Sequence, residues 1–149
     1  MPGLHREDSR ESGWFRGSAP DEVAVRPRRG QPAEIDRALQ EAASAIALMR
    51  TAYGSNLQCS RFLGWTVSAC LDHGRLELGR RLLDEALDLT SGEGERYWVA
   101  ELFRLQARLL AGEGAPADQV TAALDRALAT ARSQGARTFE ARAAADAAR

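Results

Sequence analysis

The sequence predicts an all-α protein made of antiparallel helix pairs, and three observations lead to this class. Segments with the apolar period of a helix follow one another from Pro32 onward, and none alternates with the period of two that marks a strand. Glycines separate these segments. An internal repeat aligns them, because Ala45, Ala86 and Ala127 are spaced by 41 residues. We therefore expect about six antiparallel helices, arranged as about three pairs.

The first 32 residues of the 149-residue chain lack this pattern. Gly, Pro, Ser and Arg dominate them, and their few large apolar residues follow no helical or strand period. We expect residues 1–32 to be disordered and residues 33–149 to form the helical repeat domain. Two alternatives stay open for the first segment: a small basic docking site at Arg26, Arg28 and Arg29, or a start codon assigned too far upstream.

Each expected helix takes its bounds from its apolar stripe and from the residue that ends it. Glycine suits the left-handed conformation in which many helices end. One class of turn glycine lies within a helix pair and the other between pairs: Gly74 and Gly114 in the first class, Gly54, Gly94 and Gly135 in the second. The predicted helices are 33–50, 57–73, 76–91, 95–111, 117–134 and 138–148.

Small residues at the repeated positions predict close contact between paired helices. The aligned residues Ala45, Ala86 and Ala127, together with Gly79, would let the backbones approach. Larger side chains would fill the space between layers: Phe62, Leu63, Leu83, Phe103 and Leu124. The last helix is rich in alanine and poor in bulk, so we expect it to pack weakly.

The spacing of three residues resembles a known repeat. Gly74 stands at the turn within a pair, Gly79 follows five positions on, and Ala86 follows seven positions after that. This pattern resembles the tetratricopeptide repeat, although the repeat here is longer than the usual length of about 34 residues. The resemblance implies a right-handed α–α superhelix, a solenoid that binds proteins on its concave face.

A narrower resemblance covers roughly residues 33–145. The segments ERYW at residues 95–98 and QGAR at residues 134–137 make the chain similar to the C-terminal repeats of large bacterial signalling ATPases. These include adenylate-cyclase-type proteins and ATP-dependent transcriptional activators, in which the repeats follow a nucleotide-binding domain. The chain has no GxxxxGK[ST] loop, cyclase domain or helix-turn-helix, so only the repeat module is represented.

Composition argues against several classes of function. With 20 basic and 21 acidic residues the net charge is −1, which disfavours binding to nucleic acid or to a membrane surface. The longest apolar runs fall short of the roughly 20 residues that cross a bilayer. The two cysteines, Cys59 and Cys70, are expected to be reduced and half-buried, which together with the polar N-terminus predicts a cytoplasmic protein.

No catalytic or metal-binding constellation stands out. His5 and His73 are the only histidines, so acid–base catalysis by histidine is not expected. The sequence gives no reason to expect a cofactor. Cys70 and His73 have ligand spacing but lack further ligands, and we expect His73 at a helix end instead. A cluster of three arginines is expected to form a solvated mixed-charge face with acids within helical reach: Arg75, Arg80 and Arg81 with Asp72, Glu77, Asp84 and Glu85.

The function that follows is protein–protein interaction without catalysis. An aromatic cluster, Tyr97, Trp98 and Phe103, would either form a ligand surface or, as we prefer, fill the core between repeats. Residues of the first helices would line the concave face, and our candidates for partner contact are Arg61, Thr66, Tyr97 and Gln106. The alternative is a fragment of an ATP-dependent regulator or adenylate cyclase. The exposed ends of a short solenoid would also allow self-association into a homo-oligomer, whereas binding to nucleic acid is not expected.

Overall fold

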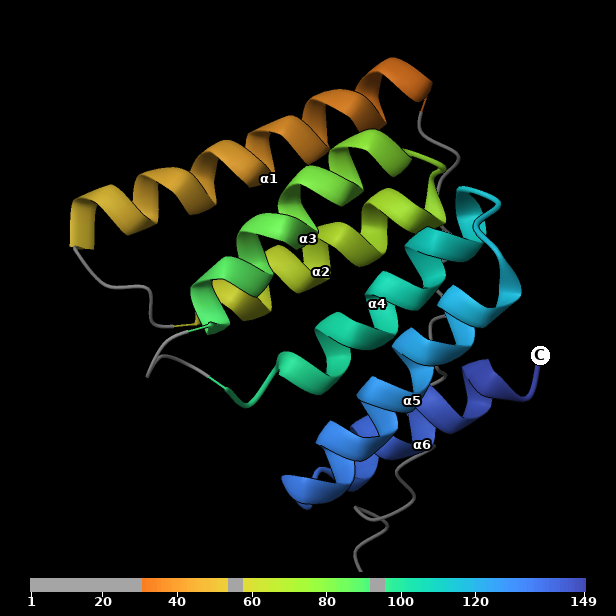
Figure 1. The fold of residues 1–149 in the computed structure, drawn as a ribbon. Coiled ribbons are helices and arrows are strands. Elements are labelled where there is room, and N and C mark those ends of the chain that lie inside the picture. Colours follow the sequence, from red (N-terminus) through yellow and green to blue (C-terminus); the bar gives the residue numbers. More distant parts are fainter. Residues whose placement is uncertain (1–30, 54–57, 92–95) are drawn as a thin grey trace, which may run out of the picture. The chain divides into compact units, whose positions relative to one another are not determined.

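Six α-helices make up the regular structure of the part of the chain that can be described (Figure 1). The computed structural model describes residues 31–53, 58–91 and 96–149, and it contains no strand within them. The helices are α1 (Pro32–Tyr53), α2 (Cys59–Asp72), α3 (Leu76–Thr90), α4 (Val99–Gly112), α5 (Ala117–Ser133) and α6 (Arg137–Ala147). The all-α prediction is confirmed. The disorder predicted for residues 1–32 falls almost wholly outside the described residues.

Consecutive helices pack against one another, and α4 also contacts both α2 and α6. The turns at Gly74 and Gly114 join α2 to α3 and α4 to α5, and these two pairs make the most extensive contacts in the molecule. We therefore call α2, α4 and α6 the first helices, and α3 and α5 the second helices. The helix α1 precedes the first of these pairs and packs on α2.

Three turns between helices have the same backbone geometry. In the turn after α2, the Arg75 N–H donates to the carbonyl oxygen of Cys70 at 2.8 Å, which satisfies a carbonyl that the helix end leaves open. The equivalent bonds follow α4 and α5. The predicted turn glycines have positive φ in all three: Gly74 at 69°, Gly114 at 73° and Gly135 at 64°. The glycines predicted for turns at residues 54 and 94 lie outside the described residues.

The small residues of the repeat are buried in α3 and α5 but not in α1. Ala86 and Ala127 are fully enclosed, and a Cβ on Gly79 would lie 3.4 Å from the Cβ of Cys70, so α3 approaches α2 closely there. Ala45, by contrast, is exposed, and the prediction that it faces the paired helix is wrong. The helix α1 instead buries its larger aliphatic side chains, Leu39 and Ile46, because these remove more apolar surface from water than alanine does.

The largest core cluster consists of aliphatic side chains and both cysteines. Cys59 and Cys70 are buried near opposite ends of α2, and burial raises the pKa of the Cys70 thiol. None of the described helices combines the length and the apolar character needed to cross a membrane.

Arginines that were expected to pair within their own helix instead reach neighbouring helices. Arg75 binds Asp36 of α1, and Arg80 binds Glu113 beyond the end of α4. The predicted mixed-charge face is present, because the Arg75 and Arg80 side chains are paired with acids and partly exposed. The predicted partners, acids within reach along the same helix, are wrong. A long arginine side chain can satisfy an acid across a helix interface, which the spacing along one helix does not reveal.

Candidate functional site

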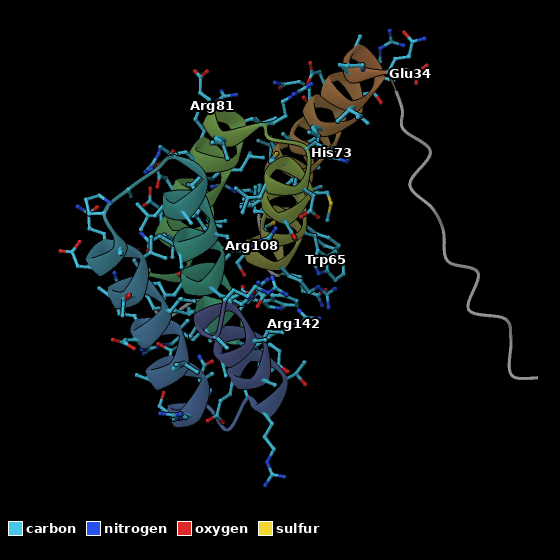
Figure 2. The ribbon with its side chains drawn as sticks, turned by 90° about the vertical axis from the view of Figure 1, so that its right-hand side faces the viewer. Glu34, Trp65, His73, Arg81, Arg108 and Arg142 are labelled. Carbon is cyan, nitrogen blue, oxygen red and sulfur yellow. The ribbon has the colours of Figure 1, made fainter. Side chains whose placement is uncertain are left out.

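Polar side chains connect the first helices at the spacing of the sequence repeat. Arg108 of α4 donates to Ser68 Oγ of α2 at 3.4 Å, 40 residues away. From α6, Arg142 donates to Glu101 Oε1 of α4 at 3.3 Å, 41 residues away. The ring contacts of Trp65 with Trp98 and of Trp98 with Phe139 lie nearer the N-terminal ends of the same helix pairs. The contacts therefore advance in the same direction along each pair, so α2, α4 and α6 run parallel. Figure 2 shows Trp65, Arg108 and Arg142, one from each first helix, on this side of the molecule.

Beneath this surface lies a buried ion-pair network. Arg104 donates to both oxygens of Glu101, at 2.7 and 2.9 Å, and to Asp146 Oδ2 of α6 at 2.5 Å. The side chains of Glu101, Arg104 and Asp146 are only 6, 11 and 13% exposed. The hydrogen bond to Glu101, followed by that to Asp146, raises the pKa of Arg104, so its charge is permanent.

This network has more arginines than carboxylates, and its acids lie deeper than its outer bases. Arg142 and Arg149 reach the same two carboxylates that Arg104 already binds, at 3.3 Å each. Their side chains are 52 and 79% exposed. A surface cavity of about 330 Å³ opens among these groups and is lined by Arg104, Arg108, Arg142, Ala145, Asp146 and Arg149. The surface therefore presents guanidinium groups outward over buried acids.

A row of aromatic rings crosses the same first helices near the N-terminal end of α4. The ring centroids of Trp65 and Trp98 are 6.0 Å apart, and those of Trp98 and Phe139 are 5.1 Å apart. Trp98 and Phe139 belong to a small core cluster, but Trp65 is 52% exposed and Tyr97 is 62% exposed. The inner rings hold the outer two in place through edge-to-face contacts.

An arginine stacks on the outer end of this row. The Arg61 guanidinium lies 5.0 Å from the ring centroid of Trp65 and 5.2 Å from that of Phe62. This is cation–π geometry, which restrains both partners. We define the arginine–aromatic face as Arg61, Trp65, Tyr97, Arg108, Arg142 and Arg149.

The four predicted contact residues divide into two groups. Arg61 and Tyr97 belong to the arginine–aromatic face. Thr66 is nearly buried and its hydroxyl donates to the Phe62 carbonyl oxygen at 3.0 Å, as hydroxyls in helices often do. Gln106 is half-buried, and its Oε1 is enclosed without a hydrogen-bond partner in the described part of the chain. We leave Thr66 and Gln106 out of the candidate site.

Trp65, the most prominent member of the site, was not among the predicted contact residues. The signal was present, because Arg61, Trp65, Ser68 and Asp72 fall on one face of a helix by their spacing of three and four residues. Only the placement of α2 beside α4 shows that this stripe faces outward.

The other sequence candidates have structural roles. Trp98 packs in the small core cluster, and Phe103 is half-buried beneath the Arg126 guanidinium at 4.2 Å. Cys70 is enclosed in the core while His73 is the exposed C-cap residue of α2, so the two do not share a surface. Within the described ranges, no cluster of three or more His, Cys, Asp or Glu side chains could hold a metal ion.

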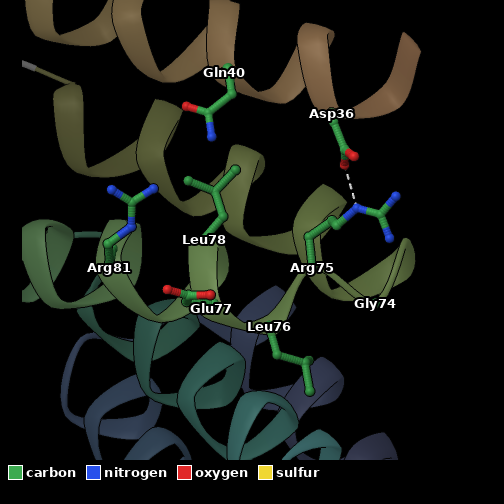
Figure 3. Close-up of a pocket in the computed structure, with 8 residues that line it drawn as sticks. All are labelled: Asp36, Gln40, Gly74, Arg75, Leu76, Glu77, Leu78 and Arg81. Atoms are coloured by element: carbon green, nitrogen blue, oxygen red, sulfur yellow. Dashed lines mark hydrogen bonds and ion pairs between the residues drawn. The ribbon is translucent and has the colours of Figure 1, made fainter. Parts of the chain in front are cut away.

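A second cavity lies beside α1 and the beginning of α3, with a volume of about 470 Å³ (Figure 3). Its rim carries both signs of charge: Asp36 and Glu77 against Arg75 and Arg81. Arg75 already binds Asp36 across this space. The cavity therefore lacks the surplus of arginines and the exposed aromatic residue that distinguish the arginine–aromatic face.

Comparison of the chain with protein-family models, with curated proteins and with solved structures finds no match.

Proposed function

We propose that this chain is a non-catalytic docking module that binds a partner protein on the arginine–aromatic face. The observation that carries the proposal is the half-exposed Trp65, held between the Arg61 guanidinium and the Trp98 ring. Tryptophan, tyrosine and arginine are the residues that contribute most to binding at protein interfaces. A large aromatic side chain that is restrained before binding also loses little conformational entropy on binding.

We also propose that the helices form a right-handed superhelix of the tetratricopeptide type. Three observations support it: the parallel first helices, their contacts at repeat spacing, and the shared geometry of the glycine turns. In such an array the first helices line one continuous surface. The arginine–aromatic face lies on these helices, where a partner would meet several repeats at once.

A peptide-display selection tests the proposed function. A random peptide library is selected on the wild-type chain, and each bound clone is then tested against Trp65→Ala and against a control, Leu48→Ala. Leu48 is 67% exposed on α1, so it matches Trp65 in exposure but lies outside the face. We expect Trp65→Ala to weaken binding by at least about tenfold and Leu48→Ala to leave it unchanged. The proposal would be contradicted if the clones bound Trp65→Ala as tightly as wild type, or if the selection yielded no binding clone.

A further inference from the structure

We infer that the partner segment is acidic, with carboxylate side chains that bind Arg142 and Arg149 beside an apolar residue on Trp65. This inference rests on the proposed function and adds the chemistry of the partner. The geometry of the ion-pair network supplies the argument.

The acids of the ion-pair network lie deeper than its outer arginines. The carboxylates of Glu101 and Asp146 are nearly enclosed, and Arg104 lies against both of them. Arg142 and Arg149 contact carboxylate oxygens from the solvent side and keep most of their own surface open. An approaching ligand therefore meets positive groups first, and the acids below them are already neutralised.

The guanidinium groups of this face select planar anions such as carboxylates. Each guanidinium carries five N–H donors in a planar fork that matches a carboxylate. Arg142 uses one nitrogen on Glu101, and Arg149 uses one on Asp146, so each fork keeps donors for a ligand. Arg142 lies on α6 and Arg149 lies two residues beyond its end, and both line the cavity of about 330 Å³. A segment that places carboxylates at this cavity would engage both.

The charges of this face favour an acidic protein segment over nucleic acid. A phosphate backbone needs a track of cations without interspersed acids, because each contact depends on releasing counterions. Here Asp72 is 59% exposed beside Arg108 and would repel phosphates, whereas a peptide can place its carboxylates at Arg142 and Arg149 alone. The net charge of −1 for the whole chain also disfavours a polyanion.

Fluorescence anisotropy on the full chain tests the inference with defined probes. Three pools of labelled dodecamer peptides contain Leu and Phe in random order with one other kind of residue. The acidic pool adds Glu and Asp, the amide pool adds Gln and Asn, and the basic pool adds Arg. Labelled oligo(dT) is the fourth probe. We expect the acidic pool to bind at least about tenfold more tightly than the amide pool, and added salt to reduce the difference. Arg142→Gln combined with Arg149→Gln should remove this preference. The control Arg132→Gln, an exposed ion-pair arginine on α5, should preserve it.

The outcomes distinguish the inference from the proposed function. Equal binding of the acidic and amide pools, with both sensitive to Trp65→Ala, would overturn the inference and leave the docking proposal standing. If any pool binds the Trp65→Ala variant as tightly as wild type, both the inference and the docking proposal are overturned. Failure of the acidic pool to bind, or tighter binding of oligo(dT), would also overturn the inference. Circular dichroism of each variant shows whether its helices are intact.

Discussion

Arg104 of α4 donates a hydrogen bond from Nη1 to Oδ2 of Asp146 on α6 across 2.5 Å, while its other nitrogens bind Glu101. This contact ties the last helix to the preceding first helix. The apolar pattern of α6 predicts only weak packing, and Phe139 and Ala143 are its buried residues. The ion pair adds an anchor that the apolar pattern does not contain.

Removal of the Arg104 guanidinium should destabilise the chain markedly. Arg104→Met would leave two nearly buried carboxylates without their main partner, and we expect the free energy of unfolding to fall by about 3 kcal/mol. Urea denaturation followed by circular dichroism measures this. Arg132→Met, at an exposed ion pair, is the control and should change stability by less than about 0.5 kcal/mol. Equal effects of the two substitutions would contradict the role given to Arg104.

The turn after α2 depends on a glycine at positive φ. Gly74→Ala should lower the free energy of unfolding by about 1 kcal/mol, because a Cβ is unfavourable in the left-handed conformation. Space is not the cause, since no atom lies within 4 Å of the added Cβ. Gly74→Asn should cost less, because asparagine adopts this conformation more readily. An alanine variant as stable as wild type in thermal unfolding would refute this account of the turn.

Close approach of α2 and α3 should set a size limit at Gly79. In Gly79→Ala the added Cβ would lie 3.4 Å from the Cβ of Cys70, an ordinary van der Waals distance, so the better helix propensity of alanine should raise the free energy of unfolding by up to about 1 kcal/mol. Gly79→Leu should overpack the interface and cost about 1–3 kcal/mol. Chemical denaturation of both variants separates the effect of side-chain size from the effect of helix propensity on the free energy of unfolding. A leucine variant as stable as the alanine variant would show that the helices are not closely packed there.

The Arg80–Glu113 pair should give a small pH dependence of stability. Hydrogen bonding from Arg80 lowers the pKa of Glu113 below its usual value. A carboxyl whose pKa is lower in the folded state stabilises that state above the unfolded pKa, and this contribution disappears as the pH falls through the folded pKa. The pair is exposed, so the effect on stability is modest. Carboxyl-carbon NMR titration should show the Glu113 pKa rising in Arg80→Gln, and an unchanged value would contradict the pairing.

The sequence predicted the helices more fully than the site. Turn glycines and apolar periodicity are local signals, and they placed every helix within a few residues of its bounds. The repeat correctly predicted that Ala86 and Ala127 are buried. It wrongly predicted the same for Ala45, because α1 buries larger aliphatic side chains on another face. Such competition between two faces of one helix depends on its neighbours.

The site depends on contacts between helices, which sequence spacing does not encode. Arg61 and Tyr97 were identified because their residue types suit an interface. Trp65 and Arg142 gain their significance only when α2, α4 and α6 lie side by side, which brings residues about 40 positions apart together. The repeat spacing of 41 contained this information in principle. Applying it would have required knowing that the first helices run parallel and adjacent.

Site-specific photo-crosslinking tests the central claim, that the arginine–aromatic face is where a partner docks. A photoreactive phenylalanine replaces Tyr97, which is 62% exposed on the face, in one variant, Leu48 of α1 in a second and Arg126 of α5 in a third. Products formed in the producing cells are identified by mass spectrometry. We predict a defined protein product from position 97 that is missing from positions 48 and 126. Crosslinking to the same protein from all three positions, or from position 48 or 126 alone, would contradict the claim.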